Sequence, residues 1–173
     1  NMDQALLVTT LAQPMTSTGF MDRFLSTAEA YSIPTIIVFN KIDLYDEEEM
    51  MELEYREAVY SAIGYKVLKT SAMQGIGVEK LKEKLKDKTT LLSGHSGVGK
   101  STLVNAVEPN LDLRTGTVSL SHRKGQHTTT FAEMHPLRIG GDVIDTPGIK
   151  GFGMVNMKKE EISHFFPEIF ALS

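Results

Sequence analysis

The sequence predicts an α/β fold, a six-stranded and mostly parallel sheet with helices on both faces. The first observation behind this prediction is that short apolar runs alternate with helix-like segments, as they do in successive βαβ units. The second is that two of these runs lead into FNKIDL and SGHSGVGKS, polar stretches placed where open α/β sheets bind ligands. The length of 173 residues fits one domain with a sizeable core.

Apolar runs and helical periodicity set the order of the elements. Strands are predicted at Ala5–Thr10, Thr35–Phe39, Tyr65–Thr70, Thr89–Gly94, Phe131–Ile139 and Gly141–Gly148. Helices are predicted at Ser17–Ile33, Asp46–Ile63, Gly77–Leu85 and Lys100–Glu108. Carboxylates of the run Asp46–Glu49 suit the first turn of their helix, because its amino end is the positive end of the helix dipole. The pair Gly140-Gly141 predicts a hairpin turn, and the polar stretch Asn110–Thr130 predicts a functional or mobile loop.

Composition is that of an ordinary globular protein, with 41% hydrophobic and 23% charged residues. We expect a cytoplasmic monomer without membrane contact, because the sequence shows neither a long apolar run nor a basic-then-apolar leader. Cysteine is absent, which excludes disulfides and thiolate metal sites from this sequence. The net charge of -4 argues against a protein that coats nucleic acid with its whole surface. Because the chain begins at Asn1 rather than Met, we expect it to be part of a longer protein.

The stretch Gly94–Ser101, called the phosphate loop below, matches the pattern G-x-x-x-x-G-K-[ST] between an apolar strand and a helix. Glycines let the backbone turn its N–H groups inward, and the following helix N-terminus adds positive potential. Lys100 would reach the β- and γ-phosphates, and Ser101 would hold Mg²⁺. The nucleotide-binding residues predicted here are Gly94, His95, Ser96, Gly97, Val98, Gly99, Lys100, Ser101 and Thr102. The alternative is a glycine-rich turn with a chance lysine, and the motif alone does not choose between ATP and GTP.

The stretch Asn40–Asp43, called the NKID segment below, supplies that choice. The carboxylate of Asp43 can accept from the N1–H and the N2 amine of guanine, whereas adenine would leave it unpaired. An unpaired buried polar group costs about 1–3 kcal/mol, more when charged, so GTP is favoured tens-fold or better. Asn40 would fix the loop and touch the purine edge, and the stem of Lys41 would cover the ring. Next along the chain, Ser71 and Ala72 would offer an amide N–H to the guanine O6.

The stretches GQHTTT and DTPG predict the elements that face Mg²⁺ and the γ-phosphate. Asp145 would hold the Mg²⁺ shell through water, and the Gly148 N–H would face the γ-phosphate. Thr129, with Thr128 as the second choice, would close over the metal and the γ-phosphate. The alternatives are a Pro-Gly turn and a β-prone threonine run at the start of a strand.

The position after D-x-x-G, where many GTPases carry a glutamine that orients the attacking water, is occupied here by Ile149. The isoleucine side chain cannot orient water, so intrinsic hydrolysis should be slow or another group must act. His127 lies beside the switch threonines in the sequence and can donate or accept near neutral pH, which makes it a candidate catalytic residue. The alternative is a solvated loop histidine.

The order of these motifs predicts a circular permutation. NKID and TSA precede the phosphate loop, HTTT and DTPG, although the phosphate loop comes first in most proteins that own both motifs. Relabelled by position in an ordinary GTPase sheet, the strands occur as fourth, fifth, sixth, first, second and third. Domain termini tend to lie close together at the surface, so such a permutation is tolerated. The sequence therefore predicts a circularly permuted GTPase domain of the P-loop NTPase fold, in the motif order NKxD–SA–P-loop–switch I–DxxG.

The sequence resembles one family over nearly its whole length, the circularly permuted ribosome small subunit-dependent GTPase A (RsgA) family. The stretches that carry the resemblance are NMDQALLV, FMDRFL, NKIDL, GHSGVGKSTLVNA, GQHTTT, VIDTPGIKGFG and FPEI. The resemblance implies GTP hydrolysis stimulated by the small ribosomal subunit, a role in its late maturation, and contact with its rRNA. It implies a GTPase domain over residues 1–160, with 161–173 starting a linker or helix toward a further domain. It also implies an OB-fold domain before this segment and a Zn²⁺-binding domain after it, both absent from this sequence.

Two other classes of function stay open at this point. One is an assembly module that binds GTP or GDP and RNA while hydrolysis is incidental, which Ile149 leaves possible. The other is a large-subunit assembly GTPase that shares the permutation, which GQHTTT and the FPEI stretch disfavour. An ATPase is the reading that the NKID segment argues against.

Overall fold

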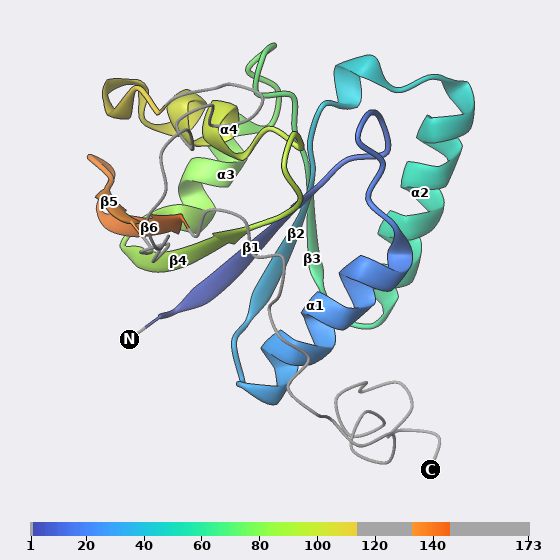
Figure 1. Ribbon diagram of the computed structural model, residues 1–173, viewed down its shortest axis with the longest axis horizontal. Coiled ribbons are helices and arrows are strands. Elements are labelled where there is room, and N and C mark those ends of the chain that lie inside the picture. Colours follow the sequence, from blue (N-terminus) through green and yellow to red (C-terminus); the bar gives the residue numbers. More distant parts are fainter. Residues whose placement is uncertain (1, 114–132, 146–173) are drawn as a thin grey trace, which may run out of the picture.

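Six strands form one sheet in the computed structural model, which describes residues 2–113 and 133–145 (Figure 1). The strands are β1 (Gln4–Thr9), β2 (Thr35–Phe39), β3 (Lys66–Lys69), β4 (Lys88–Ser93), β5 (Glu133–Pro136) and β6 (Gly141–Asp145). Their order across the sheet is β3-β2-β1-β4-β6-β5. All neighbouring pairs are parallel except β5 and β6, which pair antiparallel. The predicted six-stranded, mostly parallel sheet is confirmed.

Helices cover both faces of this sheet, as predicted (Figure 1). They are α1 (Thr18–Ala30), α2 (Glu47–Ala62), α3 (Val78–Leu85) and α4 (Lys100–Val107), with two short 3₁₀ helices, η1 (Ile42–Leu44) and η2 (Pro109–Leu111). Residues of α1 and α2 share one core layer with the sheet, and residues of α3 and α4 share the other.

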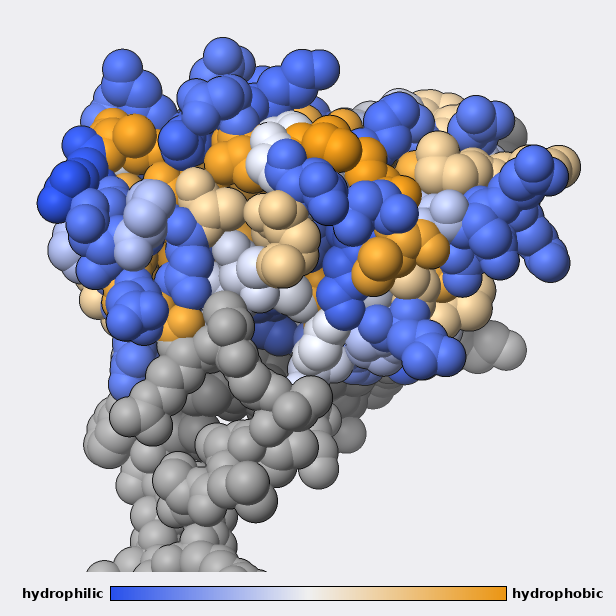
Figure 2. Space-filling model, turned by 90° about the horizontal axis from the view of Figure 1, so that it is seen from above, coloured by the Kyte–Doolittle hydropathy of each residue, from blue (hydrophilic) through white to orange (hydrophobic). Residues whose placement is uncertain are grey.

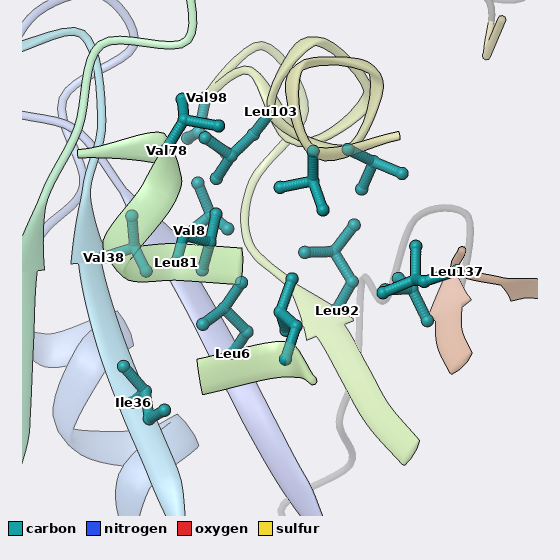
Figure 3. Packing of buried hydrophobic residues seen from close by; sticks show 14 residues of the cluster. Leu6, Val8, Ile36, Val38, Val78, Leu81, Leu92, Val98, Leu103 and Leu137 are labelled. Carbon is teal, nitrogen blue, oxygen red and sulfur yellow. The ribbon is translucent and has the colours of Figure 1, made fainter. Parts of the chain in front are cut away.

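The central strand β1 is buried on both sides, which explains its uninterrupted apolar run. Successive side chains of a strand point to opposite faces, so Ala5 and Leu7 pack in the layer of α1 and α2, and Leu6 and Val8 in the layer of α3 and α4. Figure 3 shows Leu6 and Val8 in this second layer together with Leu81 of α3. Each fully buried leucine or valine contributes about 1.5–3 kcal/mol, so burial on both faces stabilises the position of β1 in the middle of the sheet.

The amino ends of α1 and α2 are capped by side chains. The Ser17 hydroxyl accepts from the Phe20 N–H at 3.2 Å and caps α1. Asp46 and Glu49 form a reciprocal capping box at the start of α2, with bonds of 2.8 and 3.0 Å. The α3 and α4 helices instead begin after glycines in the left-handed region, so no side chain covers the first N–H groups of either helix.

Strands β2 and β3 follow one another outward on one side of β1, whereas β4, β6 and β5 lie on its other side. The boundary between β1 and β4 is therefore the switch point of the sheet. β1 leads into α1 on one face, and its neighbour β4 leads into α4 on the other. Open α/β sheets bind ligands in the crevice outside the carboxyl ends of strands at such a switch point. The phosphate loop follows β4, and the NKID segment follows β2, one strand beyond β1.

The structure shifts one predicted strand. The strand expected over Phe131–Ile139 ends at Pro136, because Leu137 begins the turn into β6. The Gly140 N–H donates to the Leu137 carbonyl at 3.0 Å, and the Leu137 N–H donates to the Gly141 carbonyl at 2.9 Å. The predicted hairpin itself is confirmed. Within residues 2–113 and 133–145, no helix is both long enough and apolar enough to cross a membrane.

Candidate functional site

Three glycines shape the phosphate loop between β4 and α4. Gly94, Gly97 and Gly99 have φ values of +148°, +87° and +96°, which L side chains rarely adopt. A Cβ at Gly99 would lie 2.5 Å from Nδ2 of Asn40, so this position needs glycine for space as well as for conformation. The pattern G-x-x-x-x-G-K-[ST] therefore sits on a strand-to-helix turn, the context that a phosphate-binding loop needs.

The Lys100 side chain folds back over this loop. Its Nζ donates to the carbonyls of Gly94 at 2.8 Å and His95 at 2.9 Å. Burial lowers the pKa of the Lys100 ammonium, and the nearby carboxylate of Asp145 opposes that change. A partly desolvated cation at the start of an uncapped helix gives the loop the electrostatics of an anion site. Ser101 and Thr102 are half-buried in the first turn of the same helix.

Asn40 joins the phosphate loop to the turn after β3. This side chain is only 1% exposed. Its Nδ2 donates to the Val98 carbonyl at 3.0 Å, and its Oδ1 accepts from the Thr70 hydroxyl at 2.9 Å and the Ala72 N–H at 3.2 Å. Segments 58 residues apart along the chain are thus held together by one amide group.

Lys41 makes a second bridge between the NKID segment and the phosphate loop. Its Nζ donates to the Gly97 carbonyl at 2.5 Å and to the Gln13 carbonyl at 3.0 Å. Its backbone is left-handed, with φ of +64°, and turns the chain into η1. Asp43 lies in η1 and is exposed, and within residues 2–113 and 133–145 no hydrogen bond or ion pair engages its carboxylate. That carboxylate is therefore available to a ligand.

The turn after β3 holds the other two residues predicted on this side. Ser71 is fully buried and pairs with Ile76 through two backbone hydrogen bonds of 3.0 Å, which close the turn. Its hydroxyl accepts from the Gln74 N–H at 3.2 Å. Ala72 follows and is held by Asn40. The predicted residues of the NKID segment, the TSA stretch and the phosphate loop all lie at one edge of the sheet.

Asp145 ends β6 close to the phosphate loop. Burial raises the pKa of this carboxyl group, and the charge of Lys100 partly opposes the rise. Its Oδ1 is buried, and no described group hydrogen-bonds to it. An orphaned carboxylate oxygen beside a phosphate loop fits a hydrated divalent cation, because Mg²⁺ keeps several waters and takes few protein ligands. The described residues hold no cluster of three or more His, Cys, Asp or Glu side chains that could bind a metal alone.

The remaining predicted site residues lie outside the described residues. They are His127, Thr128, Thr129 and Gly148. Ile149, which occupies the position of the water-orienting glutamine, also lies outside the described residues.

Sequence reasoning missed the segment between β1 and α1. The Tyr45 hydroxyl accepts from the Leu11 N–H at 3.0 Å and donates to the Asn40 carbonyl at 2.8 Å, which fixes this segment to the NKID segment. Gln13 supplies one of the two carbonyls on Lys41. Phe20, in the first turn of α1, contacts the His95 ring with 3.8 Å between ring centres. Most of these contacts use backbone groups, which leave no residue pattern in a sequence.

Comparison with known proteins gives one consistent match. Residues 1–155 match the family described as RsgA GTPase. A Flavobacterium psychrophilum protein named "Small ribosomal subunit biogenesis GTPase RsgA" is 57% identical over 172 residues, 99% of this chain and 53% of its own length. The Bacteroides fragilis protein of the same name is 55% identical over 173 residues, 100% of this chain and 56% of its own. The chain thus spans about half the length of these relatives.

Two solved structures show the same fold. YjeQ from Thermotoga maritima superposes with a TM-score of 0.83 at 42% identity, over 97% of this chain and 55% of that one. YloQ, described as a circularly permuted GTPase, superposes with a TM-score of 0.73 at 34% identity, over 99% of this chain and 53% of that one. The predicted circularly permuted P-loop fold is confirmed.

Proposed function

Because the chain belongs to the RsgA GTPase family, we propose that it binds GTP together with Mg²⁺ and hydrolyses GTP to GDP and phosphate. The observation that carries this proposal is the contact between the NKID segment and the phosphate loop. Asn40 bonds to Val98, and Lys41 bonds to Gly97. A guanine reader and a phosphate cradle are thus packed against each other, as one nucleotide spanning both requires.

Each side of the site has a distinct task in this proposal. Backbone N–H groups of the phosphate loop and the Lys100 ammonium bind the phosphates, and that ammonium stabilises charge on the transferred group. The exposed carboxylate of Asp43 accepts from the guanine N1–H and N2 amine, with Ser71 and Ala72 beside the O6. Asn40 acts from behind, as a positioning residue that holds the two sides at a fixed spacing.

Mg²⁺ would be held at Ser101 and, through water, at Asp145. The buried, unpartnered Oδ1 of Asp145 supports this assignment. When bound, the ion neutralises charge on the phosphate oxygens. We propose Thr129, or else Thr128, as the further ligand, and His127 and Gly148 as the groups beside the γ-phosphate. The division of the chain at residue 160 stays a prediction.

The relatives' names support a role at the small ribosomal subunit. We propose that the protein that contains this chain acts in the cytoplasm as a monomer in maturation of that subunit, contacts its rRNA, and is stimulated by it in GTP hydrolysis. Ile149 gives the reason for external stimulation, since it cannot orient water. A zinc site would belong to the family's C-terminal domain. The competing candidate, a GTP- and RNA-binding module with incidental hydrolysis, predicts no stimulation.

Calorimetric titration of the chain with GTP, GDP and ATP tests nucleotide choice. We expect binding of both guanine nucleotides and a preference over ATP of at least about tenfold. Asp43→Asn should abolish the preference, whereas Glu47→Gln, at another exposed acid four residues away, should leave it intact. Equal affinity for ATP and GTP in the unaltered chain would refute the proposal. Single-turnover cleavage by the full-length protein, with and without small subunits, decides between the enzyme and the binding module.

A further inference from the structure

We propose that the groove along α2, bordered by α1 and by the segment between β1 and α1, is a docking surface for a basic, amphipathic helical segment of a protein partner. Two adjoining hollows, of about 240 and 680 Å³, form this groove, and Tyr55 of α2 lines both. The smaller hollow lies between α1 and α2 beside Val59 and Ile63. The larger continues toward the amino end of α2, beside Met15 and Met51. None of the residues that line the groove is among the nucleotide-binding residues proposed above.

The groove exposes apolar side chains that the fold does not use. Met51, Tyr55 and Met15 are 71%, 66% and 62% exposed, and Val59 is 41% exposed. Figure 2, which looks at the molecule from above, shows apolar residues scattered among hydrophilic ones over that face. Tyrosine and methionine are enriched in protein–protein interfaces, and methionine adapts to the shape of a partner. Exposed apolar side chains that line one groove with a polar rim are suited to contact a protein partner.

The rim of the groove is acidic. The acids that line the two hollows are Asp22, Asp46, Glu48, Glu49 and Glu52. Arg56 is the one cation among the described lining residues, and it is buried. Its Nε pairs with Glu52 at 2.6 Å, and its Nη1 donates to the Thr16 carbonyl at 2.8 Å. The remaining field is negative, so it attracts a cationic partner and repels the phosphates of RNA.

The length of α2 gives a helical occupant room to lie along the groove. The α2 helix has 16 residues and is therefore about 24 Å long, which gives an occupant lying alongside it some four turns of contact. Helices dock into grooves by an apolar stripe flanked by charges. Leucine-type side chains on that stripe would meet Met15, Met51 and Tyr55, while lysine or arginine beside the stripe would meet the acidic rim.

This inference rests on the proposed function only for the source of the partner, since a ribosomal subunit combines RNA with basic proteins. The probe is an 18-residue synthetic helix with leucine on one face and lysine on the other, titrated into the chain by fluorescence anisotropy. We expect Tyr55→Ala and Glu48→Lys each to weaken its binding at least about fivefold. Melting temperatures of the variants, measured in parallel, identify any that fail to fold.

The chain offers matched controls. Tyr31, like Tyr55, is 66% exposed but lies outside the groove, and Glu54 is an exposed acid of α2 that lines neither hollow. Tyr31→Ala and Glu54→Lys should change peptide affinity by less than about twofold. Equal losses in groove and control variants would overturn the proposal, as would equal binding of a scrambled peptide or displacement of the peptide by an RNA hairpin. Titration with GTP separates the two proposals, because the groove variants should bind GTP as the unaltered chain does.

Discussion

The phosphate loop and the NKID segment keep their shapes in different ways. Backbone conformation shapes the phosphate loop: three glycines have positive φ values, and Lys100 bonds to carbonyls only five and six residues earlier. The NKID segment depends on side chains that reach across the molecule, from Asn40 to Val98 and from Lys41 to Gly97. A local pattern therefore specifies the first, whereas the second is completed only when β2 and β4 lie in the same sheet.

This difference teaches where the site is vulnerable. A substitution in the phosphate loop acts on the local backbone, and one in the NKID segment acts on the spacing between two loops. The phosphate loop and the NKID segment contact each other at Gly99 and Asn40, because the missing Cβ of the glycine leaves room for the amide of the asparagine. Four substitutions, in order of decreasing expected effect, test this comparison.

Gly99→Ala should have the largest effect, because it strains the backbone and also displaces the Asn40 amide. We expect a loss of about 3 kcal/mol in unfolding free energy and a GTP affinity at least about a hundredfold lower. Chemical denaturation and calorimetry measure the two quantities. Gly75→Ala is the control, because its φ is +71° but no atom lies within 4 Å of the added Cβ. A loss in Gly99→Ala no larger than in this control would show that the contact with Asn40 is unimportant.

Asn40→Ala should follow, with a loss of about 2 kcal/mol, because the Val98 carbonyl and the Ala72 N–H would lose their buried partner. Guanine nucleotide affinity should fall with it, since the spacing between the loops is released. Thr70→Val removes only the hydroxyl bond to Oδ1 and should cost about 1 kcal/mol. If Asn40→Ala still bound GTP like the unaltered chain, the bridge would have no part in ligand binding.

Lys41→Met should be milder, because its ammonium bonds two carbonyls at an exposed place. We expect about 1 kcal/mol of lost stability and a GTP affinity several-fold lower. Lys66→Met, at an exposed position of the edge strand β3, is the control for removal of a surface charge. Equal binding by both variants would mean that Lys41 does not link the loops.

The smallest effect should come from the pH dependence of the phosphate loop. Burial lowers the pKa of His95 below its ordinary value of 6.5, and the charges of Lys100 and Arg23 lower it further. As the pH falls, the imidazole is therefore protonated in the unfolded chain before it is protonated in the folded chain. The contribution of His95 to the free energy of unfolding is fully present above pH 6.5 and is lost as the pH decreases below that value. Melting temperatures measured from about pH 7.5 to 5.5 should fall less in His95→Gln than in the unaltered chain. The opposite order would contradict the assignment.

The sequence predicted the strands, both helical layers and the permutation, because these depend on local apolar runs and on motif order. Element ends were less predictable. The strand expected to reach Ile139 stops at Pro136, because Leu137 hydrogen-bonds across the turn into β6. That pairing is visible only in the three-dimensional structure, so the sequence could not predict where the strand ends.

Within the candidate site, residue types and spacing pointed to Asn40, Lys41 and Lys100, whereas the partners of those residues were not predictable. Gln13 and Leu11 enter through their backbone groups, which every residue possesses. Tyr45 contributes one hydroxyl that serves two loops, and no spacing rule marks it. A sequence shows which side chains can donate or accept hydrogen bonds, but it does not show which backbone carbonyl a lysine such as Lys41 will bond to.

The bridges made by Asn40 and Lys41 join the two loops through protein groups alone. In the proposed site these bridges hold the part that would bind the purine and the inner phosphates, which GDP and GTP have in common. We therefore expect discrimination between the two nucleotides to depend on contacts with the outer phosphate of GTP. The affinity ratio of the chain for GTP over GDP accordingly measures that end of the molecule alone, and changes at Asn40 should shift both affinities in parallel.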